Sequence, residues 1–465
     1  MQVKYKMPDK KPIDIPINVG TRPDWQVRLG YPIAYNLFVG VGEMPALYST
    51  PGKVKLSTNA PDQDARAVHR SKFGGGRTFV VTKTSVLYIK DDGTYVVVGT
   101  ILNSGQTVEI DENIQNQIGI VDGKKMYVYD QRTSDFATLG SAQGFNITSP
   151  ISICVLNGIA IVLDRVSNTW VISGVNNMLQ FPVWNFPTIS SQCTQGMSVR
   201  VMNNNLHILG TTGVERWVPQ TSNSPFMFPF VKDNNYFIPY GPRSTAAVSL
   251  GKNEIFFFSY NFTPMVLNAN GYQDLLKPSD GFARIVSQYG DVDDCIASYV
   301  LFRDYEFLYM TFPDEGISWV YNRTSQTMHQ TDDIVIDGLA DYQTIATPEG
   351  IFTLSLTPDK KHRRFQSQLV RLQKGSQPNR QLINTFELQL IQGLIQPTPD
   401  EVIELTLSLD GQSYTNTVTR PFGKTGERNS VMTWSMNIAA QQAMFRCDYY
   451  GSLDLTISKA TCYIT

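Results

Sequence analysis

The chain has 465 residues, of which 41 are acidic and 39 are basic, so its formal charge is −2 at pH 7. A charge this close to zero argues against long-range attraction to DNA or to an anionic membrane, and against a protein that reads nucleic-acid sequence. Aromatic residues make up 11% and charged residues only 17%. This composition is typical of an all-β protein with many short strands, and the length allows two or three domains.

The first seventy residues are rich in proline, which has no N–H for a strand ladder and disfavours central strands. We therefore predict that residues 1–70 form an extended arm that wraps over a folded body. The polar segment Met1–Lys11 has no apolar core of a secretory signal. No apolar run in the sequence approaches the roughly 20 residues that span a bilayer. We expect no membrane insertion by this chain, and a protein that is soluble in the cytoplasm where it is made.

One local design then recurs seven times: an apolar strand, a polar turn, and a second strand rich in Tyr, Val or Trp. The copies are Thr78–Lys90, Gln117–Asp130, Gly158–Ile172, Asn205–Val218, Glu254–Asn268, Glu306–Tyr321 and Thr344–Leu356. Their spacing is close to the roughly 40 to 50 residues of one four-stranded propeller blade. We predict a β-propeller over residues 71–375. It has six or seven blades, because strands from the N-terminal arm can complete the last hairpin.

Two polar segments flank these repeats. The glycine run Phe73–Arg77 lacks the Lys-[ST] of a phosphate-binding loop, and we expect a flexible lead into the first blade. The basic run Lys360–Arg364 is expected to be a solvated face rather than a phosphate site. The segment Lys374–Pro378 has the composition of a linker.

Longer strands follow, and residues 376–465 are predicted to form a C-terminal β-sandwich. Apolar and polar residues alternate in Phe386–Leu390 and Ile403–Leu409, as a sheet with one buried face requires. A turn is expected at Asp410-Gly411, with the Asp carboxylate bonded to nearby backbone N–H groups and the Gly at positive φ. The closing strands are expected at Ser430–Met436, Ala443–Tyr449, Leu453–Ile457 and Ala460–Ile464.

No group of residues predicts catalysis, a cofactor or a metal ion. The paired acids are expected in turns, where Asp bonds locally, rather than as facing carboxylates of a glycosidase; they are Asp91-Asp92, Asp293-Asp294, Asp314-Glu315 and Asp332-Asp333. The four histidines are scattered, and His207 is expected to be a hydrogen-bonded structural residue. The five cysteines are never arranged as CxxC, and we predict buried, reduced thiols.

The most unusual local composition is aromatic and lies around residues 225–240. Prolines keep its first part out of a central strand, so large apolar side chains need cover from another surface. Two alternatives stay open: a loop folded onto its own core, or contact with a neighbouring subunit. The candidate interface residues are Phe226, Met227, Phe228, Phe230, Tyr236 and Phe237.

Both ends of the chain resemble the tail-hub proteins of short-tailed bacteriophages, also called the packaged-DNA-stabilisation or head-completion family. At the start, the resemblance rests on Pro16–Val19, Leu29–Pro32, Tyr48–Gly52, Arg66–His69 and Val86–Tyr88. At the end, it rests on Ser408–Tyr414, Trp434, Phe445-Arg446 and Leu453–Ile464.

This resemblance implies a non-enzymatic virion protein in the phage tail, a hub or nozzle subunit made in the host cytoplasm. It implies a homo-oligomeric ring, expected to be a hexamer, that binds beneath a portal or adaptor ring after packaging. The ring would retain the DNA, let it pass without specific binding, and dock a tail fibre, spike or plug protein. A conduit that does not grip phosphates agrees with the low net charge.

Two other functions compete with this reading. The first is a β-propeller that binds or cleaves glycans. A monomer that cleaves oligosaccharides would indicate this function. A host-side scaffold propeller would instead bind peptides on its top face and have no affinity for a portal.

Overall fold

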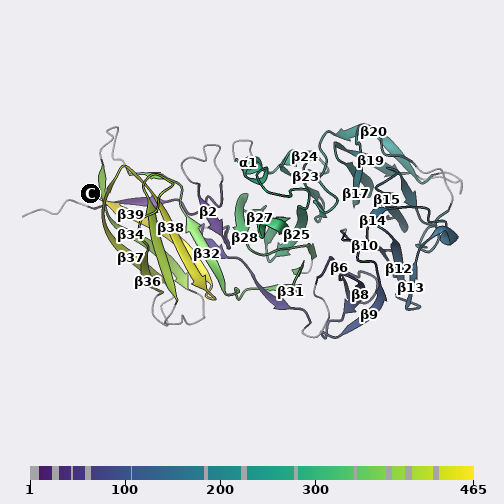
Figure 1. Ribbon diagram of the computed structural model, residues 1–465, viewed down its shortest axis with the longest axis horizontal. Helices are drawn as coiled ribbons and strands as arrows, with labels where there is room; N and C mark the ends of the chain where they lie inside the picture. The colour runs from purple at the N-terminus through teal and green to yellow at the C-terminus, as the bar shows by residue number, and fades with distance from the viewer. Residues whose placement is uncertain are drawn as a thin grey trace, which may run out of the picture.

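A computed structural model of the chain describes residues 10–22, 31–42, 45–57, 64–105, 107–182, 187–220, 228–276, 281–339, 343–372, 380–392, 401–422 and 429–465. Strands dominate these residues, and the only α-helix among them, α1 (Phe282–Val286), has five residues. Two short 3-10 helices cover Ser141–Gln143 and Pro313–Glu315. Figure 1 shows the strands as a propeller on the right and a pair of sheets, here called the two-sheet body, on the left. The predicted all-β class is confirmed.

Seven sheets form the propeller, and in the first six blades the strands follow one another in chain order from the innermost outwards. Blade one contains β6 (Ala67–Arg70), β7 (Thr78–Val81), β8 (Ser85–Ile89) and β9 (Tyr95–Thr100). Blade two contains β10 (Glu109–Glu112), β11 (Gln117–Val121), β12 (Met126–Asp130) and β13 (Asp135–Thr138). Blade three contains β14 (Pro150–Leu156), β15 (Ile159–Asp164) and β16 (Trp170–Ile172). Blades four and five contain β17 (Gly196–Met202), β18 (Asn205–Gly210), β19 (Gly213–Pro219) and β20 (Phe230–Ile238); and β21 (Val248–Leu250), β22 (Ile255–Phe258), β23 (Pro264–Asn268) and β24 (Gly271–Asp274).

Blades six and seven contain β25 (Ile296–Phe302), β26 (Tyr305–Phe312), β27 (Ile317–Asn322) and β28 (Thr327–Thr331); and β29 (Asp337–Leu339), β30 (Thr344–Thr347) and β31 (Gly350–Ser355). From β21 through β25, β29, β6, β10 and β14 to β17, neighbouring innermost strands contact one another. Arg200 of β17 donates to the Val248 carbonyl of β21 over 3.4 Å, which closes the ring. Each predicted hairpin coincides with two neighbouring strands of one blade. The predicted propeller is confirmed.

The seventh blade is completed by a strand from the N-terminal segment. Strand β5 (Gly52–Lys55) pairs with β31 in antiparallel register, from Gly52 opposite Ser355 to Lys55 opposite Phe352. The propeller therefore has seven blades rather than six. Because its last sheet joins segments about 300 residues apart, opening that blade requires separating two distant parts of the chain.

The two-sheet body has one sheet in the order β3-β4-β39-β34-β37, with β1 also on β39, and a second in the order β2-β32-β38-β35-β36, with β33 also on β38. The first sheet contains β1 (Lys11–Ile15), β3 (Leu37–Val39), β4 (Leu47–Ser49), β34 (Gln381–Gln392), β37 (Asn429–Ala440) and β39 (Leu455–Ile464). The second contains β2 (Ile33–Tyr35), β32 (Lys361–Gln366), β33 (Val370–Arg371), β35 (Val402–Ser408), β36 (Val418–Pro421) and β38 (Gln442–Gly451).

Both sheets contribute to one hydrophobic core. Phe386, Leu388 and Leu390 of β34 are fully buried, and Ile403 and Leu405 of β35 are 1% exposed, as their alternation predicts. The turn after β35 is also confirmed: Gln412 and Ser413 donate backbone N–H groups to Asp410 Oδ1 over 2.8 and 2.7 Å, and Gly411 has φ 79°.

The last strand corrects one prediction. The sequence predicts two strands, Leu453–Ile457 and Ala460–Ile464, but the structure has the single strand β39 with a register shift against β34. Ser458 is the extra residue, because Ile457 lies opposite Leu390 while Lys459 lies opposite Gln389. Such a bulge shifts the alternation of buried side chains by one position, so one strand reads as two in sequence.

A continuous ten-stranded sheet joins the two bodies. Its connecting strand is β2, which pairs in parallel with β28 of blade six through Tyr35 and Gln330, and in antiparallel with β32 from Ile33 to Tyr35. Figure 1 shows β2 and β32 between the two bodies. The predicted arm therefore supplies strands to both.

Strand pairing also places β6, within the predicted arm, in blade one, and β32, within the predicted propeller range, in the two-sheet body. The division into 1–70, 71–375 and 376–465 stays a prediction. The predicted linker Lys374–Pro378 lies outside the described residues. The run Phe73–Arg77 is not a lead into the first blade but lies between β6 and β7, with Gly75 and Gly76 at positive φ.

Candidate functional site: the joint and the channel

The joint between the propeller and the two-sheet body is built around Asn36, which is fully buried between β2 and β3. Its backbone has φ 53°, a left-handed conformation that Asn tolerates better than most residues. Thr331 Oγ1 donates to Asn36 Oδ1 over 2.8 Å, and Asn36 Nδ2 donates to the His362 carbonyl over 2.7 Å. One amide thus bonds to blade six and to β32 at the same time.

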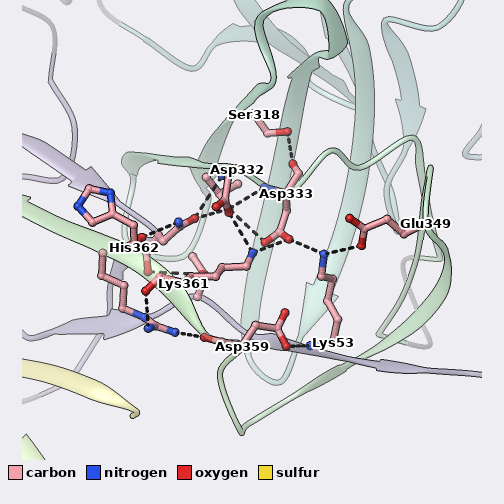
Figure 2. A network of polar contacts seen from close by, with 12 residues as sticks. Lys53, Ser318, Asp332, Asp333, Glu349, Asp359, Lys361 and His362 are labelled. Carbon is pink, nitrogen blue, oxygen red and sulfur yellow. Dashed lines mark hydrogen bonds and ion pairs between the residues drawn. The ribbon is translucent and has the colours of Figure 1, made fainter. Parts of the chain in front are cut away.

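A buried ion cluster lies beside it (Figure 2). Asp333 follows β28 and is 6% exposed; its Oδ1 lies 3.0 Å from Lys53 Nζ and 2.6 Å from Lys361 Nζ. Lys53 belongs to β5 and Lys361 to β32, so one carboxylate ties three segments together. Burial opposes ionisation, but the two ammonium groups hold the pKa of Asp333 below its usual value.

The basic run is therefore not a solvated face, and that prediction is wrong. Arg363 is 1% exposed and donates to the carbonyls of Gly451 (2.7 Å) and Asp359 (2.8 Å). His362 Nε2 and Arg364 Nε each lie 2.7 Å from Asp448 Oδ1. These partners come from β38 and from the turn before β32, so the run is one half of the joint. The sequence does contain acidic partners for the basic run, in the acid pair Asp332-Asp333, but nothing in the sequence indicates that the acid pair and the basic run contact each other.

The propeller channel is the second candidate. It holds a cavity of about 380 Å³ that is lined by all seven innermost strands. Glu109 and Arg200 form a two-pronged ion pair in it, with both N–O distances 2.7 Å, between blades two and four. Such a pair is strong and geometrically specific.

At three places, side chains of one innermost strand accept backbone N–H groups from the innermost strand of the next blade. Backbone N–H groups of Val68, Val155 and Tyr299 donate to Asp337 Oδ2, Asp111 Oδ2 and Ser249 Oγ over 2.9, 2.7 and 2.9 Å. An innermost strand has no further strand on its axial side, and these acceptors replace it. Burial raises the pKa of Asp337 to about 6 and also raises that of Asp111.

The predicted interface residues are scattered. Phe230 is 4% exposed and half-buried Phe228 packs 5.3 Å from the Trp170 ring, as a loop folded on its own core would. Tyr236 is half-buried under Arg216, 4.2 Å away, whereas Phe237 is 39% exposed. Phe226 and Met227 lie outside the described residues. The interface itself stays a prediction.

The remaining candidate site residues, which are acids, a histidine and cysteines, are paired or buried within the fold. Asp91 pairs with Arg70 over 2.8 Å and Asp293 with Arg243 over 2.7 Å. His207 is buried, as a structural histidine would be, and burial lowers its pKa to about 4. All five cysteines are free and buried, as predicted.

The family model described as "Bacteriophage P22 Gp10, beta-propeller", named Phage_stabilise, matches residues 39–341. The chain belongs to this family. Membership makes it a structural protein of a phage virion that stabilises packaged DNA, and it supports a role without catalysis. The family suggested by the resemblance is thus confirmed.

No curated protein matches the sequence. Among solved structures, the virginiamycin B lyase from Staphylococcus aureus has a TM-score of 0.46 and 9% identity, covering 65% of this chain and 98% of the lyase. The extracellular domain of a putative one component system from B. thetaiotaomicron has a TM-score of 0.44 and 10% identity, covering 88% and 62%. Within the described part of the chain, no helix has the length and apolarity to cross a bilayer.

Proposed function

We propose that the chain is a tail-hub or nozzle subunit that forms a ring beneath the portal or adaptor ring, retains packaged DNA, and docks a tail fibre, spike or plug protein. The observation that carries this proposal is the family match, which extends from the arm through the first six blades and into the seventh. The ring is proposed to be a hexamer.

The joint supports a role in force transmission. A hub that holds DNA back has to pass load from one partner to another without a hinge between its parts. Here the two bodies share one sheet and a buried ion cluster around Asp333. Breaking such a cluster exposes unpaired buried charges, so bending at the joint is costly.

The channel supports a DNA path that lies outside the single propeller. The Glu109–Arg200 pair and the side chains around it occupy the axis of the subunit. DNA would then pass along the axis of the assembled ring, between copies. The near-neutral charge of the chain agrees with passage without binding.

Ring closure requires two different, complementary faces on each subunit. The outer strands of blades one and four carry exposed apolar side chains: Val96 and Val97 on β9 are 37% and 49% exposed, and Val231 and Phe237 on β20 are 48% and 39% exposed. An exposed apolar outer strand is a favourable surface for another chain. We therefore place the subunit contacts on β9 and β20.

Native mass spectrometry of the purified chain, alone and with a purified portal ring, tests the proposal. We expect a closed ring that binds the portal, and we expect Val97→Asp and Phe237→Asp to abolish the ring without lowering the melting temperature. Val166→Asp is the matched control, because Val166 is 71% exposed but lies outside the outer strands. A monomer without portal affinity would contradict the proposal.

A further inference from the structure

One end of the propeller has a basic strip across blades one to three. The strip consists of the turns between the second and third strands of these blades, residues 82–84, 122–125 and 164–169. Its exposed cations are Lys83, Lys124, Lys125 and Arg165. Blades one to three lie on the side of the propeller away from the two-sheet body (Figure 1), so that body does not cover the strip.

The turns of blades one and two are tied together. Half-buried Arg66 donates to the Lys83 carbonyl over 3.4 Å and to Ser104 Oγ over 2.9 Å, and Ser104 Oγ donates to the Asp122 carbonyl. The Asp122 side chain is fully buried, and its Oδ1 accepts the backbone N–H groups of both lysines in its turn over 2.9 and 2.7 Å. This carboxylate shapes the turn from inside, while the two lysine side chains are exposed.

The turns of blades two and three are joined through Ser149. Its Oγ donates to the Gly123 carbonyl over 2.9 Å, and the Arg165 N–H donates to the Ser149 carbonyl over 3.0 Å. Asp164 is 4% exposed; its Oδ1 accepts the Ser149 N–H over 2.9 Å and its Oδ2 accepts the Ser167 hydroxyl over 2.6 Å. The strip is therefore continuous over three blades, and its second acid is also directed inward.

The strip exposes positive charge without exposed negative charge. The three turns and the segments that join the blades, 101–108 and 139–149, contain no acid besides the two buried ones. None of the three lysine ammonium groups forms an ion pair with a described residue. Asp64, the exposed acid before β6, lies beside blade seven, where its N–H donates to a carbonyl of the β30–β31 turn over 3.0 Å. The net charge of −2 hides this local excess, because exposed acids gather instead before β25 and in the β26–β27 turn.

The composition of the strip fits phosphate groups better than a protein surface. Centres of protein interfaces are enriched in aromatic residues and depleted in lysine, whereas the strip has three exposed lysines and no exposed aromatic residue. Phosphate oxygens are bound by Lys and Arg together with hydroxyl and amide side chains. Thr84, Asn146 and Thr148 are exposed in the turns and joining segments and supply such groups.

We propose that the basic strip contacts the phosphate backbone of the packaged DNA without reading its sequence. The inference rests on the proposed role in retaining DNA, and it names the surface that touches the DNA. Contact through a few Lys and Arg side chains is electrostatic, independent of sequence and weakened by salt. Such contact is weak for one subunit and adds up when several copies face the same DNA. DNA can then be held by the ring and still pass when it is released.

Fluorescence anisotropy of labelled DNA duplexes with the purified full chain tests the proposal. We expect equal affinity for two duplexes of unrelated sequence. With four cations on phosphates, affinity should fall about tenfold when salt is raised from about 50 to about 100 mM. The strip variant, Lys83→Glu with Lys124→Glu and Lys125→Glu, should bind at least tenfold more weakly.

A control variant with the same change in net charge is Lys72→Glu with Lys90→Glu and Lys252→Glu. These lysines are exposed in turns that follow the first or third strand of a blade, at the end of the propeller opposite the strip. The control variant should bind DNA within about twofold of the unaltered chain. A milder variant, Lys124→Gln with Lys125→Gln, covers a strip variant that does not fold: it should reduce the slope of log affinity against log salt by about two.

The proposal is overturned if the unaltered chain does not bind the duplexes, if a folded strip variant retains full affinity, or if the control variant loses as much. Loss of portal binding by the strip variant, with no DNA binding by the unaltered chain, would assign the strip to an acidic protein surface instead. Ring formation and portal binding are measured on the same samples, and the strip variant should retain both. A chain that binds DNA through the strip but neither forms a ring nor binds the portal would contradict the proposed function alone.

Discussion

The propeller and the joint are stabilised in different ways. In the propeller, contacts such as Asp337 with Val68 or Ser249 with Tyr299 bridge neighbouring blades, and each is one of several similar contacts. In the joint, single side chains connect segments that are far apart in sequence: Asn36 bonds to His362, 326 residues away. Stability is therefore distributed in the propeller and concentrated in the joint, and single substitutions should be most harmful in the joint.

Removal of the central carboxylate is expected to have the largest effect. Asp333→Ala leaves Lys53 and Lys361 half-buried without their shared partner, and should lower the free energy of unfolding by about 3 to 5 kcal/mol. Urea unfolding followed by circular dichroism measures this loss of unfolding free energy. The control is Asp332→Ala, whose side chain is 40% exposed and should cost less than about 1 kcal/mol. Equal losses for the two variants would contradict a concentrated joint.

Asn36 should be next. Asn36→Ala removes the amide bonds to Thr331 and His362 and forces Ala to φ 53°, for an expected loss of about 2 to 4 kcal/mol. Asn36→Gly keeps the backbone conformation without the amide, and thermal melting of both variants separates the two terms. If the Gly variant were as stable as the unaltered chain, the amide bonds would contribute nothing.

Acid should weaken the joint. Burial opposes the ionisation of Asp448, but His362 and Arg364 hold the pKa of this carboxyl at about 2. The pKa of Asp333 is also lowered. A carboxyl with a lowered folded-state pKa stabilises the fold above its unfolded pKa, about 3.9, and loses this as pH falls through the folded value. Unfolding free energies measured from pH 5 to pH 2.5 should therefore fall, and fall less in Asp448→Asn. An identical pH profile in that variant would exclude Asp448 as a cause.

A single channel contact should matter least. Ser249→Ala removes the acceptor of the Tyr299 N–H, and the loss should be about 1 kcal/mol because the other blade contacts remain. Thermal melting of this variant beside Asp333→Ala measures the contrast directly. A loss as large as that of Asp333→Ala would mean that the propeller is no more tolerant than the joint.

The sequence predicts the propeller better than the joint, because the propeller repeats a local pattern and the joint does not. Each blade repeats a local pattern, so the hairpins Thr78–Lys90 to Thr344–Leu356 could be found from neighbouring residues alone. The joint has no repeat: the basic run at Lys361 finds its acid at Asp333 only after the chain has folded. The bulge at Ser458 split one strand into two apparent ones, and Phe228 in an aromatic run gave no sign that its ring faces Trp170.

The most direct test of the central claim, that this chain retains packaged DNA by assembly, is the amount of nuclease-sensitive DNA in virions assembled with and without it. We predict that heads filled in its absence lose their DNA to nuclease, and that adding back the purified chain protects it. Adding back Phe237→Asp should not protect it. Full retention of DNA in particles that lack the chain would contradict the account.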